Sequence, residues 1–207
     1  MRSNRAVVGL TFLIFFVISL LTNILGPLIP DIIGSFGLSL AMAGFLPFSF
    51  FIAYGVMSIP SGVLIERYRE KRVLAAAFAV ALAGSLAFAL VPRFSVGLPA
   101  LFLIGIGMAM VQVAINPLLR VAGGEEHYAF NAVAAQLVFG SASFVSPQVY
   151  SYLVGALTDY DGGGNALIAL LAALVPPQLP WISLYWLFAV VCLLMIVVVL
   201  AAHLPRV

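Results

Sequence analysis

The sequence has 207 residues, of which 64% are hydrophobic and only 8% are charged, and its formal net charge is +2. No water-soluble domain of this size buries so much apolar surface, and nine basic residues argue against nucleic-acid binding. Apolar segments of about 20 residues recur, which is the length that crosses the roughly 30 Å of hydrocarbon in a bilayer. Because the strands of a membrane barrel would alternate polar and apolar residues, the sequence predicts an all-α membrane protein.

Six spans are expected, in a single transmembrane domain that covers residues 1–207. The first span contains the helix-breaking residues Gly26, Pro27 and Pro30. Its start resembles a signal peptide, but the apolar run is too long and no cleavage site follows, so we interpret it as a first membrane helix. The expected spans are residues 7–33, 38–65, 73–91, 98–121, 129–157 and 181–202.

Two connections between these spans have a distinctive composition. Residues 66–72 form a basic loop between the second and third spans, and an apolar piece at 166–175 precedes the sixth. Ten residues are too few to cross a bilayer, so this piece predicts an interfacial or re-entrant helix. The sixth span is entered through Trp181, Tyr185 and Trp186, whose amphipathic rings suit the membrane–water interface.

The basic residues are distributed unevenly over the two sides of the membrane. An even number of spans places both chain ends on one side, and only Arg93 falls on the other. The positive-inside rule then puts both termini in the cytoplasm, which predicts a multi-pass protein of the inner (cytoplasmic) membrane. The residues assigned to the cytoplasmic side are Arg2, Arg5, Arg67, Arg69, Lys71, Arg72, Arg120 and Arg206.

The fourth span carries a row of polar side chains. Gln112, Asn116 and Arg120 are four residues apart and therefore lie on one helix face. Pro117 removes one backbone hydrogen bond and frees a carbonyl close to Asn116. Such a row must face protein or water, because lipid offers no hydrogen-bond partner. It indicates one wall of a polar path, while the alternative is that the two amides join one helix to another.

The basic loop resembles the loop motif of the major facilitator superfamily, which runs Gly, three residues, acid, Arg and then Gly-Arg-Arg or Gly-Arg-Lys. In that family the acid caps a neighbouring helix and pairs with arginines, which latches one conformation. The family's usual Asp is Glu66 here, its second Gly is Arg69, and its next basic residue is Glu70. The alternative is a solvated loop that obeys the positive-inside rule. The resemblance implies a latch formed by Gly62, Glu66, Arg67, Lys71 and Arg72, to which Arg120 is added.

Other segments are similar to the fucose/hexose:proton symporter branch of that superfamily. Residues 112–117 resemble its Glu-x-Ala-x-Asn-Pro, and residues 23–30 resemble its Asn-x-x-Asp-x-Leu-Ile-Pro. Tyr54 with residues 59–62 and Asn131 with residues 135–136 fit two further motifs, and residues 180–186 resemble the branch's entry to span six. The resemblance covers essentially the whole chain. It implies six helices built as a 3+3 inverted repeat, which form one half of a twelve-span transporter.

The resemblance also implies a binding site between the two halves. We expect Asn23, Tyr54, Gln112, Asn116 and Gln136 to line one side of a central cavity for a neutral polyol, because amides supply paired donors and acceptors. The branch's two coupling carboxylates are replaced by Gly26 and Gln112, so proton symport through those positions is in doubt. Asp31 is then a candidate for ion coupling, and the alternative is a solvated carboxylate at a helix end.

The predicted function is secondary transport of a hexose or a related sugar by alternating access, without a cofactor or a metal. The partners expected are the sugar, the lipid bilayer and a second six-helix half, which is either another copy of the chain or a separate carboxy-terminal half. The chain is otherwise the amino-terminal part of a longer protein, or a non-transporting scaffold or sensor.

Other functional classes fit the sequence less well. A rhomboid-type protease needs Gly-x-Ser-Gly and a membrane-embedded His, whereas residues 140–143 have the wrong order and both His127 and His203 lie at helix ends. No His, Asp and Glu cluster has metal-ligand spacing within the spans. Asn116-Pro117 is similar to part of the Asn-Pro-Ala motif of water channels, but such a channel would need a second copy of that motif. The acidic turn at 159–165 lacks the closing Glu of a calcium loop.

Overall fold

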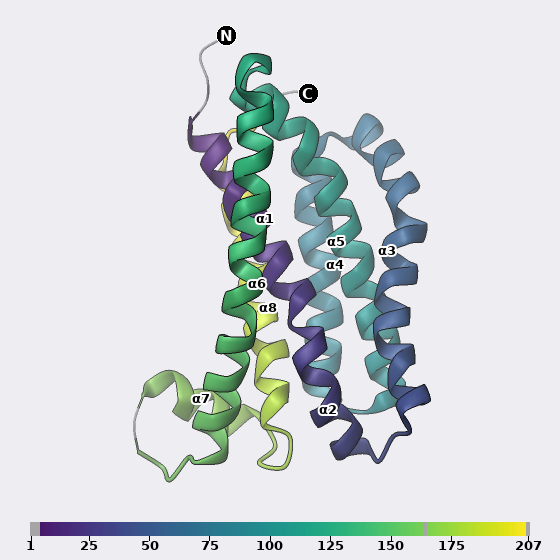
Figure 1. Ribbon diagram of the computed structural model, residues 1–207, viewed down its shortest axis with the longest axis vertical. Coiled ribbons are helices and arrows are strands. Elements are labelled where there is room, and N and C mark those ends of the chain that lie inside the picture. Colours follow the sequence, from purple (N-terminus) through teal and green to yellow (C-terminus); the bar gives the residue numbers. More distant parts are fainter. Residues whose placement is uncertain (1–4, 164, 206–207) are drawn as a thin grey trace.

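The structure is a computed structural model that describes residues 5–163 and 165–205, and these ranges contain helices but no strands (Figure 1). Six segments are long and apolar enough to cross a membrane: Arg5–Phe36, Leu40–Tyr68, Glu70–Leu90, Phe94–Gly123, Glu125–Thr158 and Pro180–Ala201. The α-helices are α1 (Arg5–Asn23), α2 (Leu25–Phe36), α3 (Leu40–Tyr68), α4 (Glu70–Leu90), α5 (Phe94–Gly123), α6 (Tyr128–Thr158), α7 (Ala166–Leu174) and α8 (Ser183–Ala201), with short 3-10 turns η1 (Glu125–His127) and η2 (Pro180–Ile182).

The first span consists of two helices, α1 and α2, with a one-residue interruption at Ile24. Pro27 has no N–H to donate to the carbonyl of Asn23, which is the residue where α1 ends. Pro30 is accommodated inside α2, in the middle of the helix. The helix therefore breaks ahead of the two prolines rather than at them.

The expected basic loop at 66–72 is almost entirely helical, so that prediction was wrong. α3 continues to Tyr68, α4 begins at Glu70, and Arg69 alone connects them. Arg69 makes the turn with φ 70° and ψ 154°, and it is the only non-glycine residue with positive φ in the described chain. The family motif has glycine at this position, and the structure explains the preference, because side chains with a Cβ are strained in this conformation.

α5 is the central helix of the bundle and packs against α3, α4 and α1, while α6 packs on α1 and α8 on α4. Glycines permit the closest approaches. A Cβ on Gly105 would lie 2.3 Å from the carbonyl oxygen of Phe50 in α3, and one on Gly107 would lie 2.6 Å from that of Ala77 in α4. Small residues thus bring helix backbones together, as expected where no hydrophobic effect acts between helices.

The residues at the start of the sixth span do not form an interfacial belt, which corrects the expectation for Trp181 and Tyr185. Both side chains are buried and make edge-to-face contacts with Phe88, and Tyr185 also contacts Phe188. The indole Nε1 of Trp181 donates to Ser35 Oγ at 2.9 Å. These rings join α2, α4 and α8 inside the bundle, because their apolar faces gain more from packing there than at the surface.

α7 is capped at its start by Asn165, whose side chain accepts a hydrogen bond from the backbone N–H of Leu167 at 3.0 Å. Ile168 and Leu171 are buried, and α7 packs against the end of α6. Figure 1 shows it beside the bundle, at the end opposite the start of α1. The apolar piece at 166–175 is thus a short helix, and whether it is interfacial stays a prediction.

The start of α1, the α3–α4 connection and the end of α8 lie at one end of the bundle (Figure 1). We call this the basic end, because Arg5, Arg67–Arg72 and Arg120 lie there, while Arg93 precedes α5 at the opposite end. Arg2 and Arg206 are outside the described residues. The basic residues of the described chain therefore gather at one end of the bundle, as the sequence predicts. That this end faces the cytoplasm stays a prediction.

Candidate functional site

The predicted polar row lies on α5, where Gln112 is half-buried and Asn116 and Arg120 are exposed. Asn116 Nδ2 donates to the backbone oxygen of Gln112 at 3.0 Å. Pro117 cannot donate to the carbonyl of Val113, which is four residues earlier. The side-chain oxygen of Asn116 and the whole amide of Gln112 have no hydrogen-bond partner among the described residues. These groups are available to bind a ligand.

The other predicted site residues come from three neighbouring helices. Tyr54 on α3 is half-buried, with its ring 6.2 Å from that of Phe50 between centroids. Gln136 on α6 is exposed. Because α5 contacts α3 and α1, and α1 contacts α6, the helices that carry the predicted residues are consecutive neighbours. The residues lie on partly open surface, as one wall of a cavity would, rather than in an enclosed pocket.

Asn23 differs from the other four, because its amide nitrogen is already used within α1. Nδ2 donates to the backbone oxygen of Ser19 at 2.9 Å and to its hydroxyl at 3.0 Å. The Ser19 hydroxyl in turn donates to the backbone oxygen of Phe139 in α6 at 2.5 Å. Asn23 therefore takes part in joining α1 to α6, and only its side-chain oxygen is left for a ligand.

Sequence reasoning missed this polar contact between α1 and α6. Ser19 Oγ lies 3.2 Å from Ser143 Oγ, and Ser146 Oγ donates to the backbone oxygen of Leu20 at 3.0 Å. The signal in the sequence that could have found it is the run of small residues at 140–143, which includes the hydroxyl of Ser143. The hydroxyls hold α6 against α1 at the depth of Asn23.

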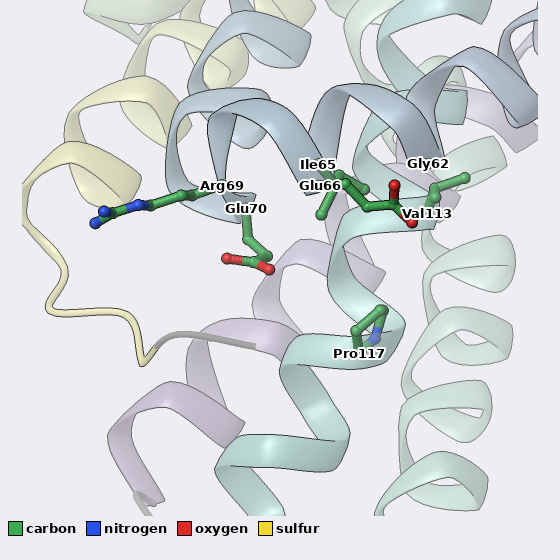
Figure 2. A pocket seen from close by; sticks show the side chains of 7 residues that line it. All are labelled: Gly62, Ile65, Glu66, Arg69, Glu70, Val113 and Pro117. Carbon is green, nitrogen blue, oxygen red and sulfur yellow. The ribbon is translucent and has the colours of Figure 1, made fainter.

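Two of the predicted latch residues, Gly62 and Glu66, line a cleft of about 430 Å³ at the basic end (Figure 2). Figure 2 shows the Glu66 carboxylate beside Val113 of α5, while Arg69 extends towards α8. No ion pair joins Glu66 to a basic side chain within residues 5–163 and 165–205. The side chains that line this cleft are Gly62, Ile65, Glu66, Arg69, Glu70, Val113 and Pro117.

Two basic members of the predicted latch, Arg120 and Lys71, have other partners. Arg120 Nη2 pairs with Glu125 Oε1 at 2.8 Å, and its guanidinium lies 5.9 Å from the Tyr128 ring centroid. Lys71 Nζ donates to the backbone oxygen of Ala202 at 2.8 Å, which caps the end of α8. Among the described residues, the Glu66 carboxylate thus has no counter-ion.

Asp31, the candidate for ion coupling, lies on α2 and is half-buried. It accepts a hydrogen bond from the Tyr150 hydroxyl of α6. This contact ties α2 to the half of α6 that lies away from the basic end. Asp31 is therefore not a freely solvated carboxylate.

The family model described as the Major Facilitator Superfamily matches residues 11–207. A glucose/galactose transporter of Brucella abortus is 30% identical over 153 residues, which are 71% of this chain and 37% of that protein. The L-fucose-proton symporter of Escherichia coli is 27% identical over 133 residues, which are 62% and 30% of the two chains.

The fold is similar to the crystal structure of the E. coli fucose:proton symporter, with a TM-score of 0.74 at 19% identity. The alignment covers 99% of this chain and 50% of the other. A bundle of six candidate spans thus matches half of a transporter structure. The protein belongs to the Major Facilitator Superfamily, a family of membrane transporters and not of enzymes. The chain spans about half the length of that solved relative, and a smaller share of the curated ones.

Proposed function

We propose that the chain forms one half of a carrier that moves a hexose or a related neutral sugar across the membrane by alternating access. The observation that carries the proposal is the amide row of Gln112 and Asn116 on a partly open face of α5. Amides give directional donors and acceptors without net charge, which suits hydroxyl groups. Arg120 is paired with Glu125, so the row offers no free cation to an anionic substrate. The names of the relatives, glucose/galactose and fucose transporters, support the same class of substrate.

The proposal that a second six-helix half covers this one rests on the exposed surfaces of α3 and α6. In the most apolar 18-residue stretch of each span, only 22% of the α3 residues and 17% of the α6 residues are buried, against 61% of those in α5. These spans also have the lowest mean hydropathy, 1.8 and 1.3, against 3.0 for the α8 span. Polar groups such as Gln136 and Gln148 on the open side of α6 are poorly suited to lipid. A second six-helix body, from another copy or a separate chain, would cover them.

The first test is binding and uptake of labelled hexoses by the purified chain in proteoliposomes. Gln112→Ala and Asn116→Ala should each weaken binding by about 2- to 13-fold, the equivalent of one net hydrogen bond of roughly 0.5–1.5 kcal/mol. Gln178→Ala, an exposed amide outside the helices, is the matched control and should change nothing. Unchanged binding in both α5 variants would contradict the site, and absence of hexose binding to the wild-type chain would contradict the substrate class.

Coupling is tested in the same vesicles with imposed proton and sodium gradients. We expect no proton coupling through positions 26 and 112, because glycine and glutamine do not titrate. If Asp31 couples an ion, Asp31→Asn removes the response to the gradient and keeps hexose exchange. A gradient response that survives Asp31→Asn would reject this role. The proposed cytoplasmic location of both termini is checked by modifying a cysteine placed at Arg67, at the basic end, and another at Ser95, at the opposite end, with an impermeant reagent.

A further inference from the structure

A second cleft at the basic end lies between the start of α4 and the end of α8. Its volume is about 310 Å³, and it is lined by Arg69–Arg72 on one side and by Leu200, Leu204 and Pro205 on the other. Lys71 Nζ, bonded to the oxygen of Ala202, holds the two sides together. The cleft thus joins a cationic wall to an apolar wall, and neither the polar row of α5 nor Glu66 contributes to it.

The cationic wall has unused binding capacity. Arg69 and Arg72 are exposed, and neither guanidinium has an acidic partner within residues 5–163 and 165–205. Glu70 also lines the cleft, but it is only 7% exposed, and Figure 2 shows its carboxylate directed away from the Arg69 side chain. The lining therefore has two positive charges in excess. Guanidinium groups bind phosphate oxygens through paired, charge-assisted hydrogen bonds.

The apolar wall continues along the outside of α8. Leu193, Val197 and Leu200 are spaced by four and three residues, so they share one helix face, and they are 53%, 58% and 54% exposed. This face extends about 10 Å from the cleft, at 1.5 Å per residue. On α4, the exposed residues Arg72, Ala76 and Ala79 have the same spacing. Both helices thus present apolar surface that leads from the cationic wall towards the middle of the membrane.

The depth of the cleft matches the position of lipid headgroups. α4 has 21 residues and is therefore about 31 Å long, close to the roughly 30 Å of hydrocarbon in a bilayer. Its first turn, which carries Arg72, then lies at the level where phosphates are found. A soluble anion would use the arginines but would leave the apolar wall and the α8 face uncovered.

We propose that this cleft binds a phospholipid with an anionic headgroup, whose phosphate contacts Arg69 and Arg72 and whose acyl chain lies along Leu200, Val197 and Leu193. The site is separate from the proposed sugar site and does not depend on it. Its expected role is to anchor the α4–α8 side of the bundle at the membrane surface.

The test uses native mass spectrometry of the purified chain released from mixed micelles that contain phosphatidylglycerol and phosphatidylcholine with identical acyl chains. The wild-type chain should retain phosphatidylglycerol preferentially. In the double variant Arg69→Gln/Arg72→Gln the preference should fall by about fivefold for each arginine, as expected for basic residues at a membrane surface. Arg67→Gln is the matched control, because Arg67 is in the same region and equally charged but does not line the cleft.

Each outcome decides the proposal. Equal retention of the two lipids by the wild-type chain overturns it without any variant. An equal loss of preference in Arg67→Gln shows a diffuse charge effect and also overturns it. Glycerophosphate in large molar excess should leave the lipid bound, and complete displacement by it would assign the cleft to a soluble phosphate instead.

Discussion

Gly105 is the position where a single methyl group should disturb the bundle most directly. It lies on α5, where the backbone of α3 passes so closely that an added Cβ would be 2.3 Å from the Phe50 carbonyl oxygen and 3.1 Å from the Ala53 Cβ. A carbon–oxygen contact needs about 3.3 Å. Gly105→Ala therefore requires α3 and α5 to separate by about 1 Å.

The expected cost follows from what the methyl group meets. Overpacking in a rigid interior costs about 1–3 kcal/mol, and the upper end applies because the contact is with backbone rather than with a flexible side chain. Replacing glycine by alanine in a helix returns up to about 1 kcal/mol. Gly105→Ala should lower the free energy of unfolding by about 2 kcal/mol. Because Tyr54 follows Ala53 directly, the same shift should weaken sugar binding.

The assay is reversible unfolding of the purified chain in mixed micelles of increasing SDS fraction, followed by circular dichroism. Gly55→Ala is the matched control, since Gly55 lies in α3 and an added Cβ there meets nothing within 4 Å. That variant should be as stable as the wild-type chain or slightly more stable. If Gly105→Ala unfolds at the same SDS fraction as Gly55→Ala, the close approach of α3 and α5 inferred here is wrong.

Three further substitutions test other contacts. Arg69→Gly should raise the free energy of unfolding by about 1 kcal/mol in lipid-free micelles, because it removes about 1–3 kcal/mol of strain and adds up to about 1 kcal/mol of chain entropy; no gain would mean that Arg69 does not hold positive φ. Ser19→Ala should cost about 1 kcal/mol by removing hydrogen bonds to α6, and a double-mutant cycle with Ser143→Ala should be non-additive; strict additivity would show that the hydroxyls do not interact. Tyr150→Phe should increase hydrogen exchange in α2 by releasing Asp31. Tyr152→Phe should not, because Tyr152 is exposed and lies two residues further along α6, on the opposite face of the helix; equal exchange in both variants would reject the role of the Asp31 contact.

Much of the fold is predictable because it depends on local properties. The number of spans follows from the length and composition of each apolar segment, and the broken first span follows from two prolines. The amide row was found because four-residue spacing defines a helix face without knowledge of any partner. In contrast, the connection at Arg69 was missed, because charged residues at 66–72 suggest a solvated loop although both helices extend into it.

The partners of each side chain could not be deduced from the sequence. Trp181 and Tyr185 have the composition of an interfacial belt, and only their contact with Phe88 shows that they are inside. Asn23 was expected to face a cavity, but its amide nitrogen already donates a hydrogen bond to the hydroxyl of Ser19. Such assignments depend on which helices are neighbours, and one residue pattern is compatible with several neighbours.

The sequence by itself determined that this protein is a helical membrane protein. It also determined which helix face carries the amides and that both chain ends share the basic side. These features follow from hydropathy, helix periodicity and the order of charges, which are properties of one segment at a time. Only the tertiary structure decided that α5 is central, that glycines set its distance from α3 and α4, and that the arginines beside Lys71 form a cleft with α8. These are contacts between segments far apart in the chain, and their energies exist only once the helices are packed.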